Sequence, residues 1–335
     1  METTDGLLFT LLRVALCDEV PETECFVALT SEEWKSLFGE AQRQNVAALT
    51  WDGIARMPEE AHPLKPTRIY WKAECQKTIE GALHKHAVTR QLVAFFKQEG
   101  IDTYVLKGDQ LSGCYPKPQL RSYSDIDIYQ GNQWKRADEL ARQRLGATVE
   151  RDHHHHTRYR VEGEQVENHY HLLNHYKYRS NVRYEREMLR YFGSPTFDAL
   201  FLLRHTACHF AVDRIGVRHL CDWMQFVRWH GGEVDWQTVR TMCRRYGMEQ
   251  FYDAMQEIIA AKLHYRCPDG KSSEGGKELS AVAQQVYDDL FQPPKEDGAL
   301  KTFCHNRWKH KLVFTDPWAW AFCQRVFSIF THTYA

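Results

Sequence analysis

The sequence lacks several features that would place it in a special class of protein. No window approaches about 18 uninterrupted apolar residues, so we expect no membrane-spanning helix. None of the ten cysteines forms a C-x-x-C pair, which argues against a zinc ribbon. Their scattered, apolar contexts favour reduced, buried thiols over a disulfide framework. The net charge of −1 provides no global basic field of the kind that advertises nucleic-acid binding, although a local basic patch stays possible.

The N-terminal segment also lacks the basic region and the small-residue cleavage site of a signal peptide. Together with the expected reduced thiols, this predicts a cytoplasmic protein. Of the 335 residues, 43% are apolar and 26% are charged, which is typical of a globular protein. This length is enough for two or three domains or subdomains. We find no internal repeat.

Residues 1–98 have the apolar periodicity of helices. Thr30 precedes two acidic residues and Trp34, which is the pattern of a helix start. A long helix is expected from about residue 67 to residue 98, with Gly100 as its C-terminal stop. This part of the chain is therefore predicted to be a helical region.

Strand patterns appear between about residues 99 and 178 and interleave with a helix. A tight turn is expected at residues 162–164, between the last two strands. These elements predict a small mixed sheet. We expect strands at 103–106, 124–129, 147–150, 155–161 and 165–172, and a helix at 133–145.

Residues 179–335 return to helical periodicity, with a possible break near Gly216 and a helix capped by Asp235. The Gly/Ser-rich segment 268–277 is expected to be a mobile loop. The predicted fold class is α+β and mostly helical. It comprises an N-terminal helical region (1–98), a core with a small mixed sheet (99–178) and a C-terminal helical region (179–335).

The segment from Val105 to Tyr129 carries the clearest chemical signal. Side chains alternate faces along a strand, so Asp125 and Asp127 point the same way while the intervening isoleucines point into a core. Two neighbouring carboxylates repel each other unless a cation lies between them. This pattern predicts a divalent metal ion, with magnesium or manganese as the natural choice for oxygen ligands.

Residues around the two aspartates suggest phosphoryl or nucleotidyl transfer. Gly108 lets the backbone approach phosphate oxygens, and Lys107 and Arg121 can meet the negative charge of a triphosphate. Two-metal enzymes usually need a third carboxylate from a neighbouring strand. Glu167 lies mid-strand, where propensity disfavours it, and His169 shares its face.

The chain resembles the nucleotidyltransferase superfamily of the DNA polymerase β type, and more closely a bacterial family of uncharacterised nucleotidyltransferase-like proteins. The resemblance lies in Leu106-Lys107-Gly108, in Tyr115-Pro116-x-Pro118 with Arg121, and in Asp125-Ile126-Asp127-Ile128. It continues in Val166-Glu167-x-His169-Tyr170. Only residues 105–129 and 165–171 are specific, although the looser resemblance covers most of the chain.

The resemblance implies transfer of a nucleoside monophosphate from a nucleoside triphosphate to a hydroxyl or amine acceptor. Asp125 and Asp127 would hold the metal ions, and Glu167 would complete one metal site and help to activate the acceptor. The acceptor is a small molecule, RNA or protein. Arg218 and Asp222 are spaced as a helical ion pair, and Arg218 would line an acceptor pocket with His169 if its helix packs on the sheet.

Two other hypotheses stay open. The superfamily's usual Gly-Ser is here Lys107-Gly108-Asp109, which favours a non-catalytic relative that binds a nucleotide or a partner. The other hypothesis is a metal-dependent phosphohydrolase whose site is formed by histidines. His205 and His209 have metal-ligand spacing on a helix but are also typical of helix packing, and the run from His153 to His156 would alternate faces on a strand.

Overall fold

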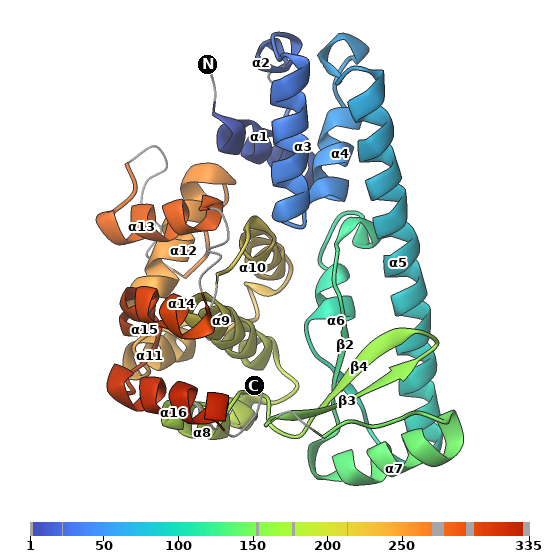
Figure 1. Ribbon diagram of the computed structural model, residues 1–335, viewed down its shortest axis with the longest axis vertical. Helices are drawn as coiled ribbons and strands as arrows, with labels where there is room; N and C mark the ends of the chain where they lie inside the picture. The colour runs from blue at the N-terminus through green and yellow to red at the C-terminus, as the bar shows by residue number, and fades with distance from the viewer. Residues whose placement is uncertain are drawn as a thin grey trace.

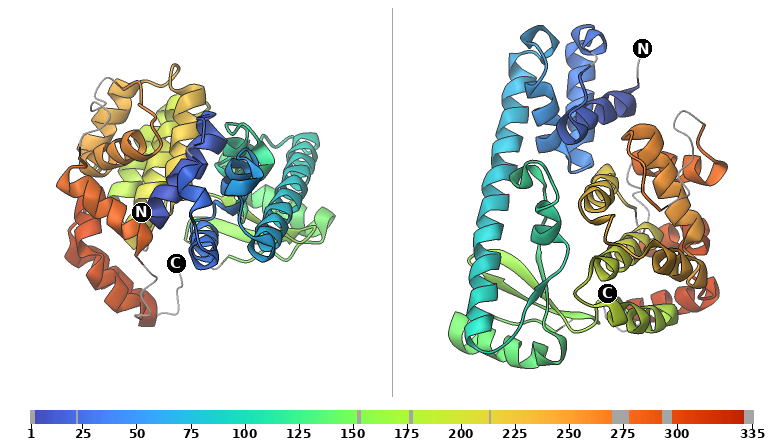
Figure 2. Two further views of the ribbon diagram at one scale, coloured as in Figure 1. Left: turned by 90° about the horizontal axis from the view of Figure 1, so that it is seen from above. Right: turned by 180° about the vertical axis from the view of Figure 1, so that it is seen from behind.

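The computed structural model describes residues 3–21, 23–151, 154–175, 178–212, 214–269, 278–292 and 298–330. It is mostly helical with one small mixed sheet, which confirms the predicted α+β class. The sheet lies between the long helix α5 (Lys65–Gln98) and the helices of the C-terminal half (Figures 1 and 2). Within these residues no helix combines the length and the apolar character that crossing a bilayer demands.

The N-terminal helices form where the sequence predicts them. The Thr30 side chain accepts a hydrogen bond from the backbone N–H of Glu33, and the Glu33 carboxylate accepts one from the backbone N–H of Thr30, so this helix begins with a capping box. Helix α5 ends just before Gly100, whose φ of +74° favours glycine. The helices before α5 are α1 (Thr4–Cys17), α2 (Glu24–Val27), α3 (Ser31–Arg43) and α4 (Ala47–Ala55).

The sheet has four strands in the order β1-β2-β4-β3. The pair β2–β4 is parallel, and the pairs β1–β2 and β3–β4 are antiparallel. The expected strand at 147–150 is wrong: within it only Glu150 forms a bridge, to Arg158, on the edge of β3 that does not pair with β4. The strands are β1 (Tyr104–Val105), β2 (Ile126–Tyr129), β3 (His156–Val161) and β4 (Glu164–His169). Helices α6 (Gly108–Ser112) and α7 (Trp134–Leu145) complete this part.

The two faces of the sheet differ in chemistry. Ile126, Ile128 and Val166 are buried in a separate apolar cluster that includes side chains of α5 and α7. Alternation then directs the side chains of Asp127 and Glu167 to the opposite face. The sheet therefore presents its acidic residues toward the C-terminal helices.

The C-terminal half consists of nine described helices. The break near Gly216 is confirmed between α9 (Pro195–Val212) and α10 (Val217–His230). Asp235 caps α11 (Trp236–Arg245) by accepting from the Thr238 backbone N–H. Most of the expected mobile loop, residues 270–277, lies outside the described residues. The other helices are α8 (Arg179–Met188), α12 (Glu249–Lys262), α13 (Ala281–Phe291), α14 (Ala299–His305), α15 (Arg307–Val313) and α16 (Trp318–Phe330).

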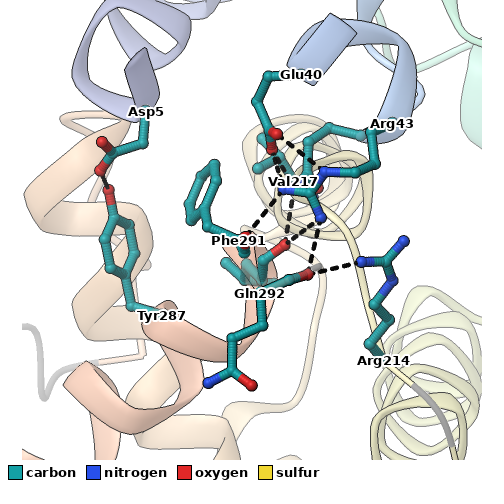
Figure 3. Close-up of polar contacts among 10 residues, drawn as sticks. Asp5, Glu40, Arg43, Arg214, Val217, Tyr287, Phe291 and Gln292 are labelled. Carbon is teal, nitrogen blue, oxygen red and sulfur yellow. Dashed lines mark hydrogen bonds and ion pairs between the residues drawn. The ribbon is translucent and has the colours of Figure 1, made fainter. Parts of the chain in front are cut away.

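Helices from the two ends of the chain share one hydrophobic core. Figure 3 shows polar contacts along this junction: Arg43 donates to the backbone carbonyls of Phe291 (3.2 Å) and Gln292 (3.1 Å). Tyr287 of α13 donates its hydroxyl hydrogen bond to Asp5 of α1. Because the N- and C-terminal helical regions share this core, each contributes to the stability of the other. The division of the chain at residues 98 and 178 stays a prediction.

Gly53 tests how closely α1 and α4 must pack. A Cβ atom at this position would stand 2.4 Å from the carbonyl oxygen of Leu11, whereas a Cβ at Gly39 of α3 would meet nothing within 4 Å. We expect Gly53→Ala to lower the free energy of unfolding by about 2 kcal/mol because α1 must shift. Gly39→Ala should raise it by about 0.5–1 kcal/mol through helix propensity. Urea denaturation measures both, and equal effects would contradict this packing.

Candidate functional site

The site begins at the turn that follows β1. Lys107 and Gly108 have φ values of +28° and +39°, and this conformation is strained for a lysine by roughly 1–3 kcal/mol. A Cβ atom at Gly108 would approach the Tyr123 ring at 3.4 Å and the Asp125 carbonyl oxygen at 3.5 Å. The turn directs the Lys107 ammonium back over β2, to the carboxylate of Asp127. The strained backbone therefore lies within the candidate site.

Asp127 is the most buried acidic group of the site. Its Oδ1 atom lies 3.0 Å from the Lys107 ammonium nitrogen and 3.0 Å from His169 Nε2. Burial would raise the pKa of Asp127, but the Lys107 charge and the contact with His169 outweigh it and hold this pKa well below its usual range. Among the described residues, the buried Oδ2 atom has no hydrogen-bond partner.

Glu167 lies beside Asp127 because the parallel register pairs these two residues. Burial, followed by the charges of Asp127 and Asp125, raises the pKa of Glu167. The Glu167 carboxylate lies 3.6 Å from His156 Nε2 and 3.8 Å from His169 Nε2. From the sequence, His156 was considered only as one of the run from His153 to His156 and was not assigned to the metal site. Its signal was the hairpin turn, which places His156 opposite His169 in the antiparallel pair.

The donor set fits a divalent cation. Ligand atoms of Asp127, Glu167 and His169 all lie within 4.8 Å of one another, and Asp127 has a second oxygen, Oδ2, without a hydrogen-bond partner among the described residues. Asp125, at the residue before β2, accepts a hydrogen bond from the Ser124 hydroxyl at 3.0 Å. Three carboxylates bring three negative charges, Lys107 supplies one positive charge, and a divalent ion would neutralise the rest.

Arg121 lies in the same region but is bound within the protein. Its guanidinium is buried and contacts the Asp222 carboxylate at 2.6 and 3.0 Å, and it also donates to the Gly108 carbonyl at 2.8 Å. Arg218 Nη1 lies 3.1 Å from the same Asp222 carboxylate and keeps a partly exposed side chain. Arg121 therefore connects the Lys107-Gly108 turn to α10, while Arg218 has access to the cavity.

Two cavities meet above the acidic face. The first has about 720 Å³ including its solvent-open part, and it is lined by Lys107, Gly108, Asp125, Asp127 and Arg218 among others. The second, of about 700 Å³ on the same measure, is lined by His155, His169, Tyr178, Asn181 and Cys208 among others. His205 and His209 of α9 line both. The two predicted acceptor residues, His169 and Arg218, thus face different cavities.

The cavity histidines on α9 and α10 are neutral at pH 7. Burial between the walls of the cleft, then the positive charges of Lys107 and Arg218, lowers the pKa of His209 to about 4, although its ring still meets solvent in the cleft. Burial and Arg218 lower the pKa of His219 to about 3. His205 Nε2 lies 3.0 Å from His209 Nε2. These rings offer hydrogen bonds without adding charge.

A small mixed sheet that presents carboxylates beside a lysine-glycine turn is consistent with the chemistry of nucleotide transfer. A sequence profile for a family described as uncharacterised nucleotidyltransferase matches residues 30–263. The chain belongs to this family, and the general kind of reaction is nucleotidyl transfer. The match includes both segments that carry the resemblance, 105–129 and 165–171. Neither a curated protein nor a solved structure matches the chain.

The buried pair of Arg121 and Asp222 gives a pH-dependent prediction. Burial would raise the pKa of Asp222, but Arg121 and Arg218 lower it to about 2. A lowered pKa stabilises the fold above the unfolded pKa of about 4, and this stabilisation, of roughly 2 kcal/mol, is lost as the pH falls through about 2.

We expect Asp222→Asn to lower the free energy of unfolding by about 3 kcal/mol at pH 7, because Arg121 stays buried without its charge partner. The difference from the unmodified chain should shrink between pH 4 and pH 2. Glu32→Gln, which breaks an exposed pair with Lys35, should have no measurable effect. Denaturant titrations at several pH values measure this. A pH-independent difference would contradict the assignment.

Proposed function

We propose that this chain is a metal-dependent nucleotidyltransferase of the DNA polymerase β type. It would move a nucleoside monophosphate from a nucleoside triphosphate to a hydroxyl or amine acceptor and release pyrophosphate. The observation that carries the proposal is the pairing of Asp127 with Glu167 on one sheet face beside Lys107, with Asp125, at the residue before β2, lining the same cavity as Asp127. The family's nucleotidyltransferase description supports the same kind of reaction.

Asp125, Asp127 and Glu167 would hold the metal ion, magnesium or manganese. When bound, the metal would neutralise phosphate charge and polarise the α-phosphorus. Asp127 is suited to this role because Lys107 keeps it ionised while its Oδ2 atom stays available among the described residues. His169 holds the other oxygen of the same carboxylate at 3.0 Å and thereby fixes its orientation.

The triphosphate is assigned to the cavity above Lys107 and Gly108. Lys107 is largely buried and Arg218 is partly exposed, and both line this cavity, where their positive charges can meet phosphate oxygens. Arg121 contributes indirectly, because its bond to the Gly108 carbonyl holds the turn in place. The acceptor is assigned to the neighbouring cavity beside His169.

In the proposed reaction, the acceptor oxygen or nitrogen forms a bond to the α-phosphorus. The bond from the α-phosphorus to the bridging oxygen breaks, and pyrophosphate leaves with its electron pair. Glu167, at the junction of the carboxylates and the histidines, receives the acceptor proton. The chain supplies orientation through the short sheet and charge through Lys107 and Arg218.

A non-catalytic relative is the second candidate, and a specific contact favours it. The Lys107 ammonium already pairs with Asp127 at 3.0 Å, and an ammonium can stand where a metal ion would otherwise neutralise this carboxylate. Lys107-Gly108-Asp109 also replaces the Gly-Ser of the superfamily. Such a protein would keep the fold and bind a nucleotide or partner without transfer.

An assay of label transfer and pyrophosphate release tests the first candidate. The chain is incubated with magnesium or manganese, labelled triphosphates and a panel of hydroxyl and amine acceptors. We expect Asp127→Asn and Asp125→Asn each to lower label transfer by at least about 100-fold, since each removes a proposed metal ligand. Asp102→Asn, at an exposed residue paired with Lys97, should leave transfer unchanged. Transfer that survives Asp127→Asn would remove the proposed site.

Manganese binding separates the two candidates without relying on turnover. Electron paramagnetic resonance of free Mn²⁺ should show binding to the unmodified chain and at least about tenfold weaker binding to Asp127→Asn and Glu167→Gln. The Asp102→Asn variant again serves as the control. No binding of Mn²⁺ to the unmodified chain, measured without triphosphate, would favour the non-catalytic candidate.

A further inference from the structure

A second cluster of metal-ligating side chains lies outside the site described above. His171 and His175 belong to the segment that follows β4, and Glu185 comes from the buried face of α8. His175 Nε2 lies 3.0 Å from Glu185 Oε2, and His171 Nδ1 lies 3.6 Å from Glu185 Oε1. The two imidazole rings lie next to each other, with centroids 4.1 Å apart. Both rings thus converge on one carboxylate.

The distances match a small transition-metal site. Bond lengths of about 2.0–2.1 Å to zinc in a tetrahedron place neighbouring ligand atoms about 3.3 Å apart. The two histidine-to-glutamate separations lie on either side of that value, and all three ligand atoms are within 4.8 Å of one another. Two imidazoles and one carboxylate form a ligand set used by zinc sites that keep a fourth position open. Magnesium prefers oxygen ligands and fits this set poorly.

The burial of Glu185 and its additional hydrogen bond also suit a metal site. The Glu185 side chain is only 7% exposed, and its Oε2 atom accepts a hydrogen bond from the Leu173 backbone N–H at 2.8 Å. Such a contact fixes the orientation of a ligating carboxylate. His171 is 43% exposed, so an ion can reach the cluster and a solvent molecule can take the fourth position.

We propose that His171, His175 and Glu185 form a zinc site that joins the end of β4 to α8. The zinc would cross-link the segment directly after His169 to the C-terminal helices. It would thereby hold the strand that carries Glu167 against the wall of the cleft. This site uses none of the residues assigned to nucleotide transfer, so the test of the zinc site does not depend on the proposed function.

A neighbouring cluster must be distinguished in the test. His155, His156 and His169 also have ligand atoms within 4.8 Å of one another, and His169 belongs to the candidate active site. His169 also belongs to the group with Asp127 and Glu167, so zinc bound in this region would involve either His156 or Asp127. The variants Asp127→Asn and His156→Asn therefore report on the active-site cluster, and His171→Ala and His175→Ala report on the proposed zinc site.

The test measures zinc alone on the full chain after removal of metals with a chelator. We expect about one zinc per chain to remain after equilibrium dialysis in excess magnesium, and Co²⁺ to give the visible absorption of an imidazole-carboxylate site. His175→Ala and His171→Ala should each weaken zinc binding by at least about 100-fold. Both side chains are partly exposed, so these variants should fold.

His84→Ala is the matched control, because the His84 side chain is 47% exposed and, like His171, lies near a mostly buried glutamate, 3.8 Å from Glu164. It should bind zinc like the unmodified chain, and Asp127→Asn should retain the same site. The proposal is overturned if the unmodified chain binds no zinc. It is equally overturned if binding persists in His175→Ala and is lost instead in His156→Asn or Asp127→Asn.

Discussion

The candidate site depends on the ion pair between Lys107 and Asp127. A buried carboxylate needs a cation or hydrogen bonds beside it to stay charged, and Lys107 reaches Asp127 from a backbone turn with positive φ. Arg121 holds that turn through the Gly108 carbonyl, and Asp222 of α10 holds Arg121. The lysine position is therefore connected through successive polar contacts to a helix about one hundred residues further along the chain.

The small sheet places the third carboxylate by its pairing. Strands β2 and β4 are parallel neighbours although α7 and β3 intervene in sequence, and their register aligns Asp127 with Glu167. A shift of one residue would move the Glu167 side chain to the face that packs on α5 and α7. The apolar cluster around Ile126, Ile128 and Val166 opposes that shift. Packing on one face thus sets the electrostatics of the other.

Local patterns in the sequence were enough to predict the alternation of Asp127 with its buried isoleucine neighbours, the hairpin at residues 162–164 and the long helix α5, although β2 begins at Ile126 and leaves Asp125 outside the strand. Alternation and turn chemistry act within a few residues, so no tertiary information is needed for them. The partner of Arg121 was not predictable in this way, because Asp222 is brought to it by packing of α10. The expected strand at 147–150 was also wrong: β3 offers it an open edge, but only Glu150 pairs there, because β-propensity alone does not decide how far a pairing extends.

The two oxygens of Asp127 are used differently, and this bears on the choice between a catalytic and a non-catalytic protein. Lys107 and His169 both contact Oδ1, whereas Oδ2 lacks a hydrogen-bond partner among the described residues. The lysine neutralises one charge of the three carboxylates, so two negative charges remain on the face. The raised pKa of Glu167 reflects burial first and then these neighbouring charges. An acidic face that its own lysine leaves incompletely neutralised supports cation binding, and hence the catalytic proposal.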